Sequence, residues 1–275
     1  MNTTASHQAP TFPPISTSPG VGFGWAVRDT MAMVWRNLTM LRRVPQLLVF
    51  ALVQPLIFVF MFRYVFGGAI NSGSAGVPYV DYLMPGIFVQ TVTFGAINTA
   101  VGLAEDKNKG LLERLKSLPM SRSAVLGGRV LADTARDVVI VVLMLNIGFL
   151  VGFNTHTNVV KVIGGVGLMV LFGFAICWIF AVIGLSVSNG EAAQAAAFPL
   201  LAPLTFASNA FVPTASMPDW LAWWADRQPL SVTVRGVRAL MLGTEPTDYV
   251  WGSIIWSLAI TLVLAPIAVR RFRNS

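Results

Sequence analysis

The sequence predicts an all-α membrane protein with six transmembrane helices. Three observations lead to this fold class. The chain is 55% hydrophobic and 11% charged, with a mean hydropathy of +0.68, whereas soluble domains contain about 25% charged residues. Long apolar segments without charge recur along the chain, and the charged residues gather between them and at the chain ends. A chain of this composition has little soluble mass of its own.

Six apolar segments are predicted to span the membrane. They cover residues 44–62, 82–104, 138–153, 162–188, 192–212 and 249–269. Most have about 19–27 residues, which is enough to cross a hydrocarbon core about 30 Å thick. The third is short, and we expect it to recruit residues 130–137 as a partly hydrated first turn or two. None carries a charge in its apolar stretch, which argues against an ion-coupled secondary transporter.

Three charged residues come closest to the membrane interior. Asp133, Arg136 and Asp137 stand at the beginning of the third span, at spacings that allow pairing along one helix. We interpret them as a structural ion-pair cluster. A functional coupling element is the alternative.

A charged island separates the second and third spans and reads EDKNKGLLERLKSLPMSR over residues 105–122. Leu111, Leu112 and Leu115 fall on one helical face, with Leu118 one turn further. Gly110 precedes this apolar stripe and Pro119 ends it. The pattern predicts a short amphipathic helix over residues 109–118 that binds another protein.

Basic residues indicate which side of the membrane the island faces. The side that is richer in Lys and Arg carries the island, the segment before the first span and the C-terminus. Its residues are Arg28, Arg36, Arg42, Arg43, Lys107, Lys109, Arg114, Lys116, Arg122, Arg129, Arg270, Arg271 and Arg273. The other side keeps Arg63, Lys161, Arg227, Arg235 and Arg238. The excess predicts a cytoplasmic island and cytoplasmic termini, and it favours contact with anionic lipid over nucleic-acid binding.

The remaining segments are assigned by their composition. Residues 1–22 are rich in Thr, Ser, Pro and Gly and predict a disordered cytoplasmic tail. Residues 23–43 predict an amphipathic helix in the cytoplasmic interface, or otherwise the cytosolic beginning of the first span. Residues 213–242, between the fifth and sixth spans, contain two short helical stretches bounded by prolines, which predict a re-entrant hairpin on the outer side. Trp220, Trp223 and Trp224 in this hairpin suit a membrane interface.

Uncharged polar residues inside the spans are candidates for a substrate pathway. Gln90, Phe94 and Asn98 lie on one face of the second span, at positions i, i+4 and i+8. Gln54 precedes a proline in the first span, and Ser208 and Asn209 lie near the end of the fifth. Each residue has packing between helices as its alternative role.

Catalytic motifs are absent from the sequence. No Gly-Lys-Ser or Gly-Lys-Thr occurs, so the phosphate loop of an ATPase is missing. One cysteine (Cys177) and two histidines provide neither a disulfide, a metal site nor a nucleophile with its base. The chain is therefore predicted to be no enzyme, with no catalytic residue, no metal and no cofactor of its own.

Two groups of residues form recognisable motifs. The first group is the island, with Glu105, Gly110-Leu-Leu-Glu-Arg-Leu115 and Pro119-Met-Ser-Arg122. The second group runs from Phe198-Pro-Leu-Leu through Ser208-Asn209-Ala-Phe-Val-Pro213 to Met217-Pro218, Trp220, Gln228-Pro229 and Arg238-Ala-Leu. With these motifs the chain resembles, over residues 23–275, the membrane subunits of ABC-2-type ABC exporters, most closely the permeases of the daunorubicin/doxorubicin-resistance type. Gln228 departs from the family, which usually has Asn or His there.

The resemblance implies partners and a role for each segment. A subunit of this family pairs with a second permease and docks on a cytosolic ABC ATPase, which binds the ATP and Mg. The island would be the coupling helix, with Glu105, Gly110, Leu111, Leu112, Glu113, Arg114, Leu115 and Pro119 as its coupling residues. The N-terminal helix would brace the ATPase, and the hairpin would cap the pathway. The expected location is the bacterial plasma membrane.

The expected function is export of hydrophobic or amphipathic small molecules or lipid-like metabolites. The alternatives are an exporter of polysaccharide or teichoic acid and, in a different class, a membrane scaffold that does not transport. The sequence leaves open whether the permease pairs with itself or with a related chain.

Overall fold

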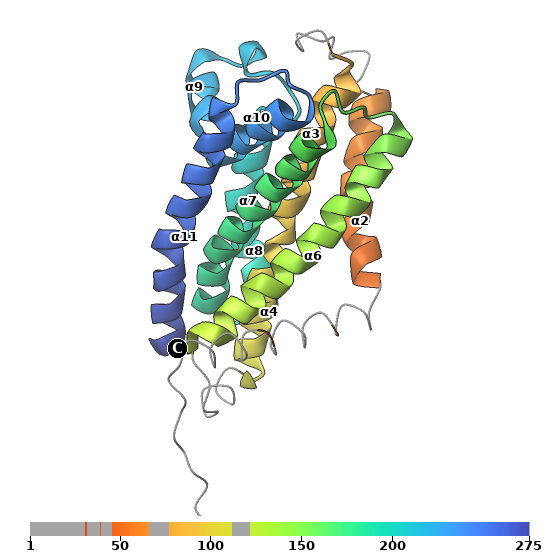
Figure 1. Cartoon of the computed structure of the whole chain (residues 1–275). Helices are drawn as coiled ribbons and strands as arrows, with labels where there is room; N and C mark the ends of the chain where they lie inside the picture. Colours follow the sequence, from red (N-terminus) through yellow and green to blue (C-terminus); the bar gives the residue numbers. More distant parts are fainter. Residues whose placement is uncertain (1–30, 32–38, 40–45, 66–76, 112–121, 275) are drawn as a thin grey trace, which may run out of the picture.

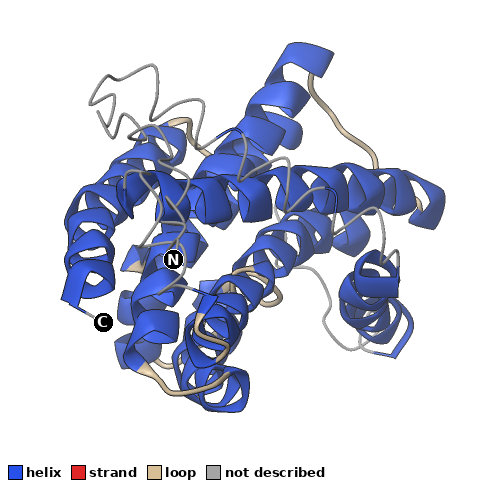
Figure 2. Cartoon of the chain, turned by 90° about the horizontal axis from the view of Figure 1, so that it is seen from below, coloured by secondary structure: helices blue, strands red, loops and turns tan. Residues whose placement is uncertain are grey.

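The computed structural model describes residues 31, 39, 46–65, 77–111 and 122–274 of the chain. Every regular element within these ranges is a helix, so the predicted all-α class is confirmed there (Figures 1 and 2). The predicted tail lies outside the described residues. Of the predicted interfacial helix, only Met31 and Thr39 lie inside them.

The helices follow one another along the chain with short connections. They are α2 (Gln46–Phe60), the π-helical turn η1 (Met61–Val65), α3 (Tyr79–Gly95), α4 (Ile97–Asn108), α6 (Arg122–Val151), α7 (Val159–Ser186), α8 (Gly190–Phe206), the 3₁₀ turn η2 (Thr214–Ser216), α9 (Asp219–Arg227), α10 (Pro229–Met241) and α11 (Asp248–Asn274).

Four helical stretches in the described part are long and apolar enough to cross a membrane. They are Tyr79–Asn108, which joins α3 and α4, Leu126–Val151, Val159–Ser186 and Asp248–Phe272. They correspond to the predicted second, third, fourth and sixth spans. The apolar piece of the first span, Ala51–Val65, and the 17 residues of α8 are shorter. Six spans therefore remain a prediction at the first and fifth positions.

Two of the long helices differ from the predicted segments. The second span is interrupted, because α3 ends at Gly95 and α4 begins at Ile97, with Ala96 between them. The third span begins well before its apolar stretch, because α6 runs without interruption from Arg122. The expected recruitment of residues 130–137 is thus confirmed and extended toward the island.

The predicted fifth span ends earlier than expected. Its helix α8 stops at Phe206, six residues before the predicted end at position 212. The Ser208 hydroxyl donates to the Thr205 carbonyl (2.5 Å) and accepts from the Ala210 amide (3.1 Å). A side chain that bonds the local backbone in this way replaces the helical ladder with a turn.

Helices α3, α4 and α7 form the centre of the bundle. Within the apolar window of the α3–α4 stretch 67% of residues are buried, against 17% in α11, which lies at the edge of the molecule (Figure 1). Helix α7 packs against α4, α6, α10 and α11. Glycine permits the closest of these approaches, since a Cβ at Gly184 of α7 would collide with the Ala100 carbonyl of α4.

The two short helices α9 and α10 lie at the end of the bundle opposite to the C-terminus (Figure 1). Most of α10 is buried against α3, α7 and α11. The tryptophans of α9 are exposed: 73% for Trp220 and 61% for Trp223. The two helical stretches stand where the sequence places the outer hairpin, while its re-entry into a membrane remains a prediction.

Candidate functional site

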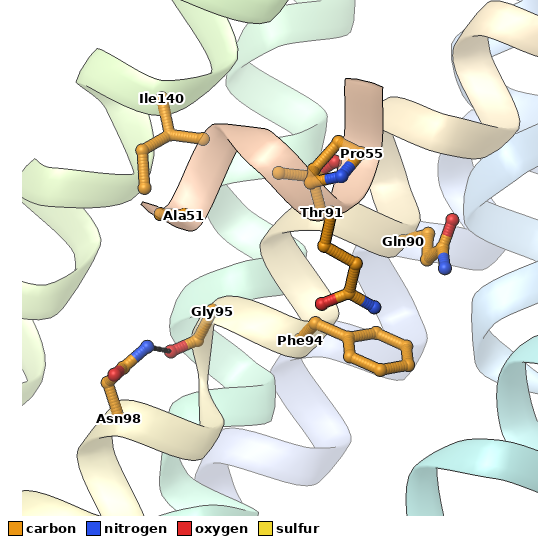
Figure 3. A pocket seen from close by; sticks show the side chains of 9 residues that line it. Ala51, Pro55, Gln90, Thr91, Phe94, Gly95, Asn98 and Ile140 are labelled. Carbon is orange, nitrogen blue, oxygen red and sulfur yellow. Dashed lines mark hydrogen bonds between the residues drawn. The ribbon is translucent and has the colours of Figure 1, made fainter. Parts of the chain in front are cut away.

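A pocket lies where α2 meets the junction of α3 and α4 (Figure 3). It has a volume of about 100 Å³. The lining residues come from α2, α3, α4 and α6, and they are Ala51, Gln54, Pro55, Gln90, Thr91, Phe94, Gly95, Asn98 and Ile140. Four of the six residues proposed from sequence as pathway candidates are therefore brought together: Gln54, Gln90, Phe94 and Asn98.

The local structure explains how these side chains reach the pocket. Gln90 and Phe94 are one helical turn apart on α3, so they face the same side. Asn98 belongs to α4, and its Nδ2 donates to the Gly95 carbonyl (3.0 Å) across the junction. Thr91 turns its hydroxyl to the carbonyl of Ile87 (2.7 Å), which leaves mainly its methyl group for contact.

The chemistry of the lining is apolar with a few amides. Gln90 is only 3% exposed, and its Oε1 has no hydrogen-bond partner within the described part of the chain. A buried acceptor without a partner is costly, so this atom is available to a hydrogen-bond donor on a ligand. The pocket is smaller than the roughly 300–1,000 Å³ typical of drug-sized ligands. In this conformation its volume is only a fraction of the space that such a molecule needs.

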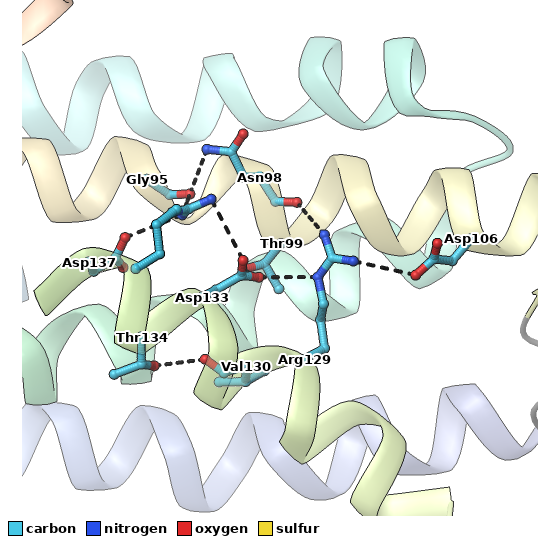
Figure 4. Close-up of polar contacts among 10 residues, drawn as sticks. Gly95, Asn98, Thr99, Asp106, Arg129, Val130, Asp133, Thr134 and Asp137 are labelled. Carbon is cyan, nitrogen blue, oxygen red and sulfur yellow. Dashed lines mark hydrogen bonds and ion pairs between the residues drawn. The ribbon is translucent and has the colours of Figure 1, made fainter. Parts of the chain in front are cut away.

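A cluster of charged residues lies beside the pocket, between α4 and α6 (Figure 4). We name it the charged cluster, and its members are Asp106, Arg129, Asp133, Arg136 and Asp137. Arg129 contacts Asp106 (3.4 Å) and Asp133 (3.3 Å). Arg136 contacts Asp133 (3.6 Å) and Asp137 (3.2 Å). The predicted ion pairing at the beginning of the third span is thus present in the structure.

The charged cluster also holds the helix junction. Arg136 donates through Nη2 to the Gly95 carbonyl (2.8 Å), the last residue of α3. Arg129 donates to the Asn98 carbonyl (3.3 Å), and Thr99 donates to Asp133 (2.7 Å). Carbonyls freed by an interrupted helix need such donors away from water. The charged cluster therefore fixes α6 to the junction of α3 and α4, where Gly95 and Asn98 line the pocket.

Sequence reasoning missed two members of the charged cluster, Asp106 and Arg129. Both were assigned to the island or its surroundings as solvated charges. The spacing of Arg129 and Asp133, four residues apart on one helix, was a signal that could have found the pair. The partner Asp106 comes from another helix, and its contact depends on the packing of α4 on α6.

Ser208 and Asn209, the other two pathway candidates, do not line the pocket. Both are buried, 1% exposed, in the turn after α8. The Asn209 amide donates to the hydroxyl of Ser231 in α10 (3.2 Å). In this structure the two residues shape a turn at the end of the bundle opposite to the C-terminus (Figure 1).

Arg238 of α10 binds the same turn. It is 1% exposed, and its guanidinium donates to the carbonyls of Tyr82 (3.0 Å), Asn209 (2.9 Å) and Ala210 (3.3 Å). It also lies over the Tyr82 ring, 3.5 Å from its centroid. Sequence reasoning counted Arg238 among the outer-side charges, and the structure shows it buried at the meeting point of α3, α8 and α10.

The island is described only at its beginning. Glu105 is exposed and pairs with Lys109 (3.0 Å), and Gly110 has a positive φ of 66°. Leu111 packs against the apolar core. Leu112, Glu113, Arg114, Leu115 and Pro119, the other predicted coupling residues, lie outside the described residues. Lys107 donates to the Leu185 carbonyl at the end of α7 (3.1 Å), which ties the base of the island to the bundle.

The described residues contain no group of three or more His, Cys, Asp or Glu side chains that could hold a metal ion. The charged cluster pairs its carboxylates with arginines instead. Its arrangement is suited to joining helices.

Comparison of the sequence with known proteins places the chain in a family. Residues 28–242 match the family model described as ABC-2 type transporter. The daunorubicin resistance ABC transporter permease protein DrrB1 of Streptomyces coeruleorubidus is 33% identical over 249 residues, which are 90% of this chain and 87% of that protein.

Two further relatives extend the comparison. The probable doxorubicin resistance ABC transporter permease protein DrrC of Mycobacterium tuberculosis is 26% identical over 253 residues, 90% of each chain. The putative transport permease ycf38 of Pyropia yezoensis is 27% identical over 250 residues, which are 87% of this chain and 84% of that protein. These matches show that the chain belongs to the ABC-2 type transporter family and that it is similar to the permeases named for daunorubicin and doxorubicin resistance.

Proposed function

We propose that this multi-pass membrane protein is the permease of an ATP-driven exporter of hydrophobic or amphipathic small molecules. The lining of the pocket is the observation that supports this substrate class most directly. Its walls are aliphatic and aromatic, while its polar groups are the uncharged amides of Gln54, Gln90 and Asn98. Such a lining recognises a mainly apolar molecule that also bears a few hydrogen-bonding groups.

The relatives support this substrate class. Two of them are named for resistance to daunorubicin and doxorubicin, which are amphipathic molecules with a flat aromatic ring system. Lipid-like metabolites share the same mixture of apolar area and a few polar groups. The proposal therefore covers both kinds of molecule.

The energy source in this proposal is a separate cytosolic ABC ATPase. The chain has no Gly-Lys-Ser or Gly-Lys-Thr, so ATP and Mg are assigned to the partner. We assign its docking to the island through Leu112 and Leu115, because Leu111 packs against the apolar core of the permease itself. A second permease, either another copy or a related chain, completes the proposed complex. Its proposed location is the bacterial plasma membrane, with both termini in the cytoplasm.

The structure suggests how a movement of the island would reach the pocket. Helix α4 ends at the island and begins at the pocket, next to the junction at Ala96. The charged cluster joins α4 to α6, the helix that follows the island. A displacement of the island would thus move α4 and the first half of α6 together and change the angle at Ala96. Such a change between two packed arrangements is how ATP binding could open or close the pocket.

The test uses inverted membrane vesicles that contain the permease and its ATPase. Uptake of doxorubicin is measured with ATP and with a non-hydrolysable analogue. We expect ATP-dependent uptake in the wild type. The substitution Gln90→Leu removes a hydrogen-bond partner that is worth about 0.5–1.5 kcal/mol, so KM should rise about two- to ten-fold.

Asn146→Leu provides the matched control. Asn146 is exposed on α6, and its amide donates to the carbonyl of Val142 in its own helix (2.7 Å). Its substitution should leave KM unchanged. Uptake by Gln90→Leu and Gln54→Leu with wild-type kinetics would contradict the assignment of the pocket to the substrate, and an absence of ATP-dependent uptake in the wild type would contradict export of this drug class.

A further inference from the structure

Four phenylalanine rings meet at the outer end of α2 and α8. We name Phe58, Phe62, Phe206 and Phe211 the aromatic cluster. The rings of Phe62 and Phe211 are stacked, with centroids 4.6 Å apart and an interplanar angle of 3°. Phe58 stacks on both, at 6.1 Å from Phe62 and 5.7 Å from Phe211. Phe206 closes the group, 6.2 Å from Phe58 and 6.1 Å from Phe211.

The aromatic cluster follows the pocket along α2 and η1. Gln54, Phe58 and Phe62 follow each other at intervals of four residues along α2 and η1, so they occupy one side of this segment. Gln54 lines the pocket, and each further interval adds about 6 Å along a helix. A molecule that leaves the pocket along α2, away from the island, meets the aromatic cluster next.

One side of the aromatic cluster is held firmly. The Phe211 carbonyl accepts from the Tyr79 hydroxyl (3.1 Å). Arg238 binds the carbonyls of the two preceding residues, Asn209 and Ala210. The Phe211 ring is only 4% exposed. This side therefore keeps its position when its neighbours move.

The other side of the aromatic cluster lies in an irregular segment of the chain. Phe62 belongs to the π-helical turn η1, and such turns interrupt a regular helix and occur often at functional sites. Phe62 and Phe58, which belong to the same segment, are both half-buried. The ring contacts therefore connect two segments, one of them anchored and the other in an irregular turn.

Stacked rings suit a particular class of ligand. Separating Phe62 from Phe211 loses their stacking, and a flat aromatic molecule between them restores it on both faces. An aliphatic molecule restores apolar contact but no stacking. Opening the aromatic cluster is consequently easier in the presence of a flat aromatic ligand.

We propose that the aromatic cluster is a second binding place on the export pathway, one that is selective for planar aromatic molecules and closes the pathway when empty. This proposal rests on the proposed function, since the aromatic cluster would lie on the pathway that this function requires. The pocket with its amides would bind many amphipathic molecules. The aromatic cluster would then favour flat ring systems among them.

The test measures binding without the ATPase. The full-length permease is placed in lipid nanodiscs, and doxorubicin binding is followed by its fluorescence anisotropy. Phe62→Leu keeps the apolar volume and removes the ring, as does Phe211→Leu. We expect the affinity for doxorubicin to fall about three- to ten-fold in each, given the energy of an aromatic pair. Phe62→Tyr keeps the ring and should bind like the wild type.

Two controls separate stacking from general packing. Phe149→Leu removes another partly exposed ring, 46% exposed on α6, and should not change the affinity. Dodecyltrimethylammonium, an aliphatic amphiphile, should displace doxorubicin with the same inhibition constant in all variants. Thermal unfolding is recorded for each variant, and the half-buried position of Phe62 keeps the test independent of the buried turn at Phe211.

Three results would overturn the proposal. They are wild-type affinity in both leucine variants, an equal loss of affinity for the aliphatic competitor, and no saturable doxorubicin binding to the wild type. The vesicle experiment distinguishes these results from a failure of the exporter itself. If the wild type exports doxorubicin and the leucine variants bind it normally, the binding role of the aromatic cluster is refuted and the proposed export function stands.

Discussion

Arg238 joins three segments, at the end of the bundle opposite to the C-terminus, through single hydrogen bonds to backbone carbonyls. Its fork of donors reaches one carbonyl of α3 and two in the turn after α8. A lysine carries the same charge, but its compact ammonium group cannot present donors in this fixed geometry. The position therefore depends on the guanidinium shape as well as on the charge.

The substitution Arg238→Lys should destabilise the protein. We expect a loss of about 2–4 kcal/mol in the free energy of unfolding, because buried carbonyls lose their donors. Unfolding by SDS titration in mixed micelles measures this quantity. Arg227→Lys is the control, since Arg227 is exposed on α9. Equal stability of the two variants would contradict the structural role of Arg238.

Asp133 is the centre of the charged cluster, where it accepts hydrogen bonds from Thr99 and Arg129 and forms an ion pair with Arg136. Asp133→Asn removes the charge between two arginines, and we expect a loss of about 3 kcal/mol. The same SDS titration measures it. Asp219→Asn, at an exposed carboxylate in the first turn of α9, should have no effect. A wild-type unfolding curve for Asp133→Asn would mean that the cluster does not hold α4 to α6.

Among the pathway candidates, helical spacing correctly predicted which residues share the pocket, whereas the predicted extent of the fifth span did not. Gln90, Phe94 and Asn98 share one face at intervals of four, and the structure places them in one pocket with Gln54. Ser208 and Asn209 were expected beside them on a fifth span, but the helix ends before them at Phe206. The burial of Arg238 could not be predicted, because a basic side chain near a membrane surface is ordinarily in water.

Helical elements were predictable because their apolar runs are long. The four long stretches follow from composition and length. The junction at Ala96 was not predictable, since no proline stands there and the interruption is stabilised from another helix. Arg136 of α6 supplies the donor for the Gly95 carbonyl. Interactions of this kind come from tertiary packing and leave no local pattern in the chain.

Glycines of α7 allow a direct test of helix packing. Gly184→Ala would place a methyl group against the backbone of Ala100 in α4, so the two helices must separate. We expect a loss of about 1–3 kcal/mol and a lower temperature of unfolding. Gly167→Ala lies on the same helix with nothing within 4 Å of the new methyl group. It should be neutral or slightly stabilising. A larger loss at Gly167 than at Gly184 would contradict the observed contact between α4 and α7.

At the scale of the whole molecule, the helices connect the two ends of the bundle. The α3–α4 stretch runs from Tyr79 through the pocket to the island at Asn108. Arg238 holds its first part, and the charged cluster holds its last part. This arrangement supports the proposed function, in which a displacement of the island is transmitted to the pocket.

The central claim is that a separate ATPase drives this permease through the island. Its most direct test is to purify the tagged permease from its native membrane with and without Leu112→Asp and Leu115→Asp. The amount of bound ABC ATPase and the ATP-dependent doxorubicin uptake in vesicles are measured together, with Leu131→Asn, an exposed residue of α6, as the control. We predict that the island variant loses both the ATPase and the uptake, while the control keeps them. Wild-type values of both in the island variant would contradict the account.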